Sequence, residues 1–122
     1  MKLSKVEKLY WHDGVISGFQ FLPNYEKTSA FLISVHLFKD PENTSERQPI
    51  EIKCKNVKRF LATCNIFELK DNSGAGNILD GWVTENTLFI HLFGGLLEIE
   101  AKKYIIKTLT KRSAGPANST GL

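Results

Sequence analysis

The residues best suited to chemistry form one cluster near the N-terminus, Tyr10-Trp11-His12-Asp13-Gly14. An imidazole beside a carboxylate could act as an oriented general base or as a pair of metal ligands. Phosphohydrolases that use an adjacent His-Asp pair also need further histidines and an aspartate on packed helices, which this chain does not offer. We therefore favour a structural interpretation, in which Trp11 closes one end of the core and Asp13 with Gly14 makes a turn. His12 would then hydrogen-bond to a neighbouring strand, and Trp11, His12 and Asp13 are kept as candidate binding residues.

Two further histidines, His36 and His91, fall in the middle of apolar segments. In an antiparallel sheet they could approach His12 and complete a three-histidine metal site. Nothing in their spacing requires this, and a lone histidine among large apolar residues is more often hydrogen-bonded in or near a core. We predict no metal ligands and no cofactor.

The motifs of nucleophilic and phosphate chemistry are missing from the sequence. Cys54 and Cys64 are its two cysteines and do not form a Cys-x-x-Cys pair. Residues 72–76, Asn-Ser-Gly-Ala-Gly, match neither a phosphate loop nor a calcium loop. No Gly-x-Ser-x-Gly occurs, and Cys54 has the apolar parity of a small core residue. We predict that the chain is not an enzyme and has no catalytic residues.

Aromatic residues are more numerous than one face of a small sheet needs, so we expect some of them at a surface. They make up 11% of the chain and include Trp11, Trp82, Phe19, Phe21, Phe38, Phe89 and Phe93. Trp82 alternates with Asp80 and Thr84, which places it on the more polar side of its strand. There it could anchor a protein partner or a stacked ligand, unless the loop of residues 39–49 covers that face.

Composition bounds the class of protein. The chain has 122 residues, 42% of them hydrophobic, and its 16 basic and 13 acidic side chains leave a net charge of +3. It is too apolar for a disordered chain, and no apolar run approaches the roughly 20 residues that cross a bilayer. The N-terminus lacks the apolar core of an export signal. We expect a cytoplasmic protein with one domain over 1–111 and a disordered tail over 112–122.

Basic residues concentrate in two places, 53–59 and 102–112. The members are Lys53, Lys55, Lys58 and Arg59, then Lys102, Lys103, Lys107, Lys111 and Arg112. Because the overall excess of charge is so small, we interpret both as solvated faces and expect no nucleic-acid partner.

Alternation of apolar and polar residues predicts an all-β fold. The predicted strands are 15–21, 30–38, 50–55, 78–84, 87–93 and 96–106, with an exposed loop over 39–49 and tight turns at Glu85-Asn86 and Gly94-Gly95. Parity in the last strand fails at Lys103-Tyr104, which predicts a bulge or a strand passing an edge.

Residues 57–65 are ambiguous. Their apolar side chains have helical spacing, but Thr63 and Cys64 are weak helix formers, so we prefer irregular structure or strand. Six or seven antiparallel strands with at most one short helix imply a sandwich or a barrel-like rolled sheet.

The opening of the chain, an aromatic residue before His12-Asp13 and then Ile16 leading into a strand, resembles that of small bacterial all-β domains. The closing segments are similar to the final meander of immunity proteins from polymorphic toxin systems and their uncharacterised relatives. These segments are Asn77-Ile78-Leu79-Asp80-Gly81, Leu88-Phe89-Ile90-His91-Leu92, the diglycine, and Leu97-Glu98-Ile99-Glu100-Ala101-Lys102. The resemblance implies a protein that binds and neutralises a cognate toxin in a bacterial cytoplasm. The loop over 39–49 and the tail after Lys111 have no counterpart in it.

We therefore predict a protein-binding module of the immunity type, with no membrane association and with an exposed edge strand that makes a homodimer plausible. One alternative is a small-molecule or nucleic-acid binder that uses Trp11, Trp82 and the lysines, and another is a cargo protein of mobile DNA. The remaining alternative is a metal-dependent enzyme built on His12, Asp13, His36 and His91.

Overall fold

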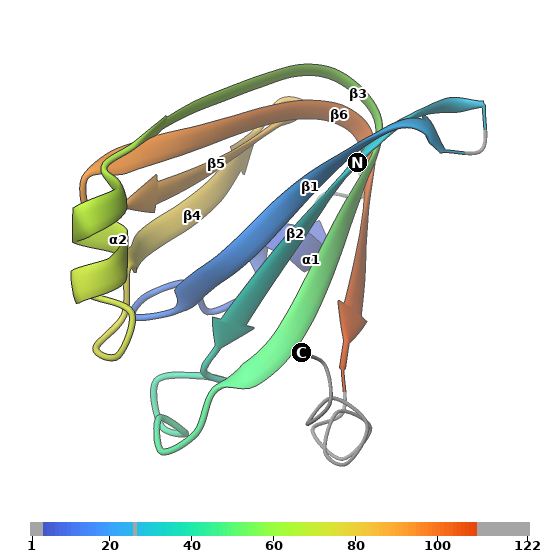
Figure 1. The fold of residues 1–122 in the computed structure, drawn as a ribbon. Coiled ribbons are helices and arrows are strands. Elements are labelled where there is room, and N and C mark those ends of the chain that lie inside the picture. Colours follow the sequence, from blue (N-terminus) through green and yellow to red (C-terminus); the bar gives the residue numbers. More distant parts are fainter. Residues whose placement is uncertain (1–3, 26, 110–122) are drawn as a thin grey trace, which may run out of the picture.

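The computed structural model describes residues 4–25 and 27–109, and these ranges form one antiparallel sheet (Figure 1). Its strands are β1 (Val15–Tyr25), β2 (Thr28–Leu37), β3 (Gln48–Cys64), β4 (Ile78–Thr84), β5 (Thr87–Leu92) and β6 (Gly95–Thr108). They lie in the order β1-β2-β3-β6-β5-β4. The predicted all-β class is confirmed, whereas the predicted tail over 112–122 lies outside the described residues.

Two long strands divide the sheet into halves that face each other. β2 pairs with β3 only as far as Lys55, and β5 pairs with β6 only from Gly95 to Glu100. Each long strand therefore has one part in the β1-β2 half and one part in the β4-β5 half, as the arched ribbons of β3 and β6 show in Figure 1. The sheet is rolled over a single core, and its edge strands β1 and β4 do not pair to close it.

The bend between the halves is at a bulge in β3. Asn56 has a positive φ of 57°, and the register between β3 and β6 shifts between Val57 and Arg59. Both features redirect the strand and increase its twist. The sequence predicted an irregularity at Lys103-Tyr104, and the structure places the register shift on the facing strand instead.

The core consists of the side chains at every second position of the strands, which point inward. Its fully buried members include Ile33, Leu37, Ile52, Leu88, Ile90, Leu97 and Ile99. Each such side chain contributes roughly 1.5–3 kcal/mol when it is removed from water. Burial of the apolar side chains at every second position therefore stabilises the rolled sheet, as the predicted period of two implies.

Among the described residues, helix occurs in two short segments, α1 (Ser4–Glu7) and α2 (Ile66–Asp71), where the sequence predicted at most one. The ambiguous residues 57–65 belong to strand, since β3 continues to Cys64. α2 begins directly afterwards because Asn65 caps it, with a side-chain oxygen that accepts the N–H of Glu68 at 3.0 Å. Neither described helix has the length and apolar character that crossing a bilayer requires.

The meander of β4, β5 and β6 is joined by two tight turns. Glu85 and Asn86 form the first, as predicted, with a φ of 57° at Glu85. The second consists of Phe93 and Gly94, because Gly95 already pairs with Leu92. The predicted Gly94-Gly95 turn is therefore displaced by one residue, and Gly94 supplies the positive φ of 81°.

One corner of the roll is closed by Asn77, whose side chain is buried. Its Oδ1 accepts the N–H of Ile16 at 2.8 Å, and its Nδ2 donates to the carbonyl of Leu69 at 3.1 Å. Next to it, Ile78 exchanges backbone hydrogen bonds with Asp13 and Gly14. The beginnings of β1 and β4 are tied together here, and farther along the two strands diverge (Figure 1).

Candidate binding site

Trp11 lies in the core, where it is 2% exposed. Its ring packs flat on Gly81 of β4, and a Cβ at that glycine would lie 2.5 Å from the Trp11 Cδ2 atom. The indole Nε1 donates to the carbonyl of Val6 at 3.2 Å, which joins α1 to the sheet. This is the plug at one end of the core that the sequence indicated, and it leaves no face of the indole open to a ligand.

His12 and Asp13 are exposed beside this plug. The His12 Nδ1 lies 3.3 Å from the Leu79 carbonyl on β4, and Nε2 lies 3.5 Å from the Asp13 Oδ2. Asp13 has a φ of 64°, and the N–H of Gly14 donates to the carbonyl of Trp11 at 2.9 Å. The turn and the cross-strand contact account for these residue types, and a side-chain contact so open to water contributes little free energy. Their role in binding stays a prediction.

The other candidate chemical groups do not gather with them. His36 is on β2 opposite Val15, and His91 is on β5 with its side chain on the exposed face. Within residues 4–25 and 27–109, no three His, Cys, Asp or Glu side chains are placed to hold a metal ion. Burial raises the pKa of the Cys54 thiol to about 12, so that thiol is protonated at neutral pH.

Trp82 lies on the outer face of β4 and is 38% exposed. Its ring stacks on that of Phe89 with centroids 5.3 Å apart and an angle of 11° between the planes. The loop over 39–49 was the possible cover for this face. Its Arg47 instead donates to the carbonyls of Asp13 and Ala75, each at 3.0 Å. The prediction that Trp82 is on the exposed side is confirmed, and its binding role stays a prediction.

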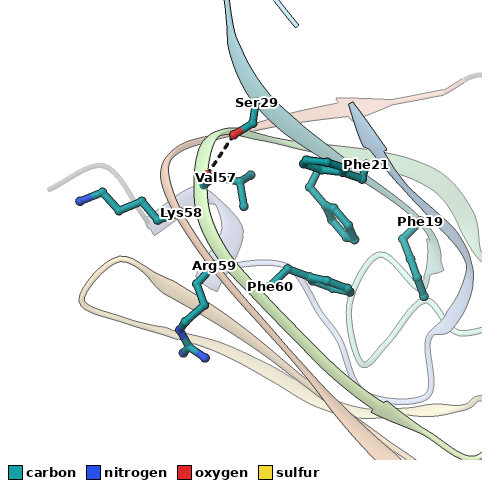
Figure 2. Close-up of a pocket in the computed structure, with 8 residues that line it drawn as sticks. Phe19, Phe21, Ser29, Val57, Lys58, Arg59 and Phe60 are labelled. Carbon is teal, nitrogen blue, oxygen red and sulfur yellow. Dashed lines mark hydrogen bonds between the residues drawn. The ribbon is translucent and has the colours of Figure 1, made fainter. Parts of the chain in front are cut away.

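One apolar surface feature of the structure was not among the sequence candidates. It is a groove of about 570 Å³ beside the bend in β3, which we call the phenylalanine groove. Its lining residues are Phe19, Phe21, Ser29, Phe31, Val57, Lys58, Arg59 and Phe60 (Figure 2). The rings come from three different strands, β1, β2 and β3.

Three rings of the groove, those of Phe19, Phe31 and Phe60, are in mutual contact. Phe31 lies 4.2 Å from Phe60 and 5.7 Å from Phe19 between ring centroids, and Phe19 lies 5.8 Å from Phe60. Phe31 is buried at the base, whereas Phe19 is 48%, Phe21 57% and Phe60 37% exposed. Such ring pairs are worth about 0.5–1.5 kcal/mol beyond the area they bury. The groove is therefore a preformed aromatic surface.

Strand register explains why inward-facing rings remain open to water. Phe19 and Phe21 lie opposite Ile33 and Phe31, so they share the core-facing side of the β1-β2 half. Phe60 lies opposite the buried Ile99 and faces inward from the other half. Because β1 is the last strand of its half, no further strand covers these rings among the described residues.

The rim of the groove is basic. Arg59 is paired on β6, with Nη2 2.9 Å from Glu98 Oε1 and Nε 3.7 Å from Glu100 Oε1. Lys58 has no ion-pair partner among the described residues, and the lining contains no acidic side chain. In Figure 2 both basic side chains extend away from the rings, and the hydroxyl of Ser29 donates to the carbonyl of Val57 at 2.9 Å. An apolar ligand with a nearby negative charge would match this surface.

The sequence contained part of the signal for the groove. The excess of aromatic residues, with Phe19 and Phe21 among them, predicted that some would lie at a surface, and their exposure confirms this. Phe60 was not assigned because residues 57–65 were ambiguous, and its position depends on the bend at Asn56. Comparison of this chain with protein-family models, with curated proteins and with solved structures gives no match.

Proposed function

We propose that this chain is a non-enzymatic binding module that holds an apolar segment of a partner protein in the phenylalanine groove. The observation that carries this proposal is the partial exposure of three rings that line one groove, Phe19, Phe21 and Phe60, two of which contact the buried ring at its base. A fully buried aromatic side chain contributes roughly 1.5–3 kcal/mol, and about half of that remains to be gained by covering rings of this exposure. Clustered aromatic residues of this kind dominate binding energy in protein interfaces.

A small apolar molecule is the second candidate. The volume of about 570 Å³ is in the range of small-molecule sites. Such sites also carry a few polar groups that orient the ligand, and here the Ser29 hydroxyl is already used by the Val57 carbonyl. We therefore favour a protein segment, for which the apolar rings and the neighbouring backbone are sufficient.

For the partner itself we propose a cognate toxin, neutralised in the cytoplasm. The support for this is the resemblance of the closing meander, 77–102, to immunity proteins, together with two cysteines that are both free. Expressing the chain together with its genetic neighbour tests it. Rescue of growth by the wild-type chain, lost in Phe21→Asp, supports the proposal, and equal growth with and without the chain counts against it.

Selection of peptides tests the binding function even while the partner is unidentified. Random peptides of roughly ten residues, the length of a long strand, are displayed on phage and selected on the full chain. Phe21→Asp puts a charge among the rings, whereas Phe67→Asp puts the same charge on α2, at a ring that is 77% exposed and does not line the groove. Because Phe21 is already half exposed, both variants should fold, which circular dichroism verifies.

The expected result is an enriched family of peptides rich in large apolar residues. They should bind Phe67→Asp as the wild type and Phe21→Asp about tenfold or more weakly. Lack of enrichment, or peptides that bind both variants equally well, would count against the groove. The small-molecule candidate would be favoured if the enriched peptides share no consensus sequence and a free naphthalene sulfonate dye prevents their binding.

A further inference from the structure

β1 is an edge strand whose side chains carry no charge, although Pro23 near its end limits strand pairing there. It is the first strand in the sheet order, so one of its sides has no neighbouring strand in the described part of the chain. The side chain of Asn77 occupies that side at Ile16, near the beginning of the strand. From Val15 to Tyr25 the strand contains no Asp, Glu, Lys or Arg, although charged side chains commonly block exposed edges. An unpaired, uncharged edge is a template for another strand.

This free edge borders the phenylalanine groove. Phe19 and Phe21 are two positions apart on β1, and both project inward from the edge. A strand laid along β1 would turn every second side chain toward these rings and toward Phe60 on the facing half. Backbone hydrogen bonds and side-chain contacts would thus be made by the same segment.

The charges at the rim of the phenylalanine groove restrict which kind of segment can bind there. Arg59 is neutralised by Glu98 and Glu100, whereas Lys58 at the same rim has no ion-pair partner among the described residues. In a second copy of this chain, the strand from Val15 to Tyr25 contains no acidic side chain that could pair with Lys58. A partner with a carboxylate at this place would complement it.

We infer that the partner segment binds as an added β-strand along β1, with alternate large apolar side chains in the groove and an acidic side chain near Lys58. The inference rests on the proposed function and specifies how its site is used. Added to β1, the strand would cover Phe19 and Phe21 and continue the β1-β2 half toward the open side of the roll.

Amide exchange, followed by NMR on the full chain with the phage-selected peptide bound, tests the backbone pairing. Strand addition should slow the exchange of alternate amides between Ser17 and Leu22, before Pro23 interrupts the ladder, by roughly tenfold or more, because each is newly hydrogen-bonded. The same peptide with one N-methylated inner residue should bind roughly tenfold more weakly. If the peptide binds and is sensitive to Phe21→Asp but no β1 amide is protected, the strand inference fails while the groove function stands. If no peptide is selected at all, the function itself fails.

A charge reversal tests the acidic residue. Lys58→Glu should weaken the selected peptides several-fold, with a loss that shrinks as salt is added. Lys107→Glu makes the same change in net charge on the exposed end of β6 and should leave binding unchanged. Equal losses in the two variants would overturn the charge assignment. A stable dimer of the free chain that Phe19→Asp dissociates would overturn the choice of occupant in favour of a second copy.

Discussion

Phe31 and Phe60 lie with ring centroids 4.2 Å apart although they belong to opposite halves of the rolled sheet. β2 supplies the first ring and the part of β3 beyond the bulge supplies the second. Their contact is the place where the core reaches the surface, because Phe31 is buried and Phe60 is 37% exposed. We therefore expect the buried ring of Phe31 to matter mainly for folding stability and the exposed ring of Phe60 mainly for binding.

Phe31→Ala should destabilise the fold by about 3–5 kcal/mol, the cost of removing a buried phenyl ring. Phe21→Ala should cost about 1 kcal/mol or less, since that ring is 57% exposed. Urea unfolding followed by circular dichroism measures both. Similar losses of stability in the two variants would show that the exposed rings of the groove are needed for folding and are not a surface available for binding.

Asn77→Ala should destabilise the protein by roughly 2–4 kcal/mol, because it leaves the Ile16 N–H and the Leu69 carbonyl without their partner in a buried corner. Asn43→Ala serves as the control. Asn43 donates to Asp40 at an exposed position, so its loss should change stability by about 0.5 kcal/mol or less. A small effect at Asn77 would mean that water replaces its hydrogen bonds and that this side chain does not hold the beginnings of β1 and β4 together.

Gly81→Ala should displace the Trp11 ring, since the new Cβ would lie 2.5 Å from it. In a Trp82→Phe background the emission then comes from Trp11 alone among the tryptophans, and it should shift to longer wavelength as the ring meets water. Gly18→Ala is the matched control, because a Cβ there meets nothing within 4 Å. An unshifted spectrum in Gly81→Ala would contradict the packing of the indole on β4.

Cys54 should make stability fall at alkaline pH. Burial raises the pKa of its thiol from the usual 9.0 to about 12, so the native state holds a proton that the unfolded chain releases. The resulting stabilisation is complete below pH 9 and is lost between about 9 and 12, at up to about 1.4 kcal/mol per pH unit. Burial also raises the pKa of Tyr104, which adds to the same trend. Thermal unfolding of the wild type and Cys54→Ala at several alkaline pH values measures the difference, and parallel curves would contradict it.

Period-two alternation was enough to predict the strands other than the second part of β3, because burial on one face of a pleated sheet leaves that pattern in the sequence. The placement of Ile52 and Cys54 inward and of Lys53 and Lys55 outward follows from it directly. The aromatic excess likewise indicated surface rings, of which Trp82 was singled out.

What alternation could not predict was the meeting of distant segments. The bend at Asn56 depends on one positive φ, and it carries Phe60 across to Phe19 on a strand some forty residues earlier. The buried Asn77 was likewise missed, since its value lies in hydrogen bonds to Ile16 and Leu69 that no local pattern contains. The groove is therefore a product of tertiary structure, formed where the bend in β3 brings Phe60 to the rings of β1 and β2.

The most direct test of the groove is the set of nuclear Overhauser contacts between the selected peptide and the aromatic protons of the full chain. Binding in the groove predicts contacts to the rings of Phe19, Phe21 and Phe60, with none to His12. Contacts confined to Trp82 and Phe89, or to His12 and Tyr10, would place the binding surface elsewhere and contradict it.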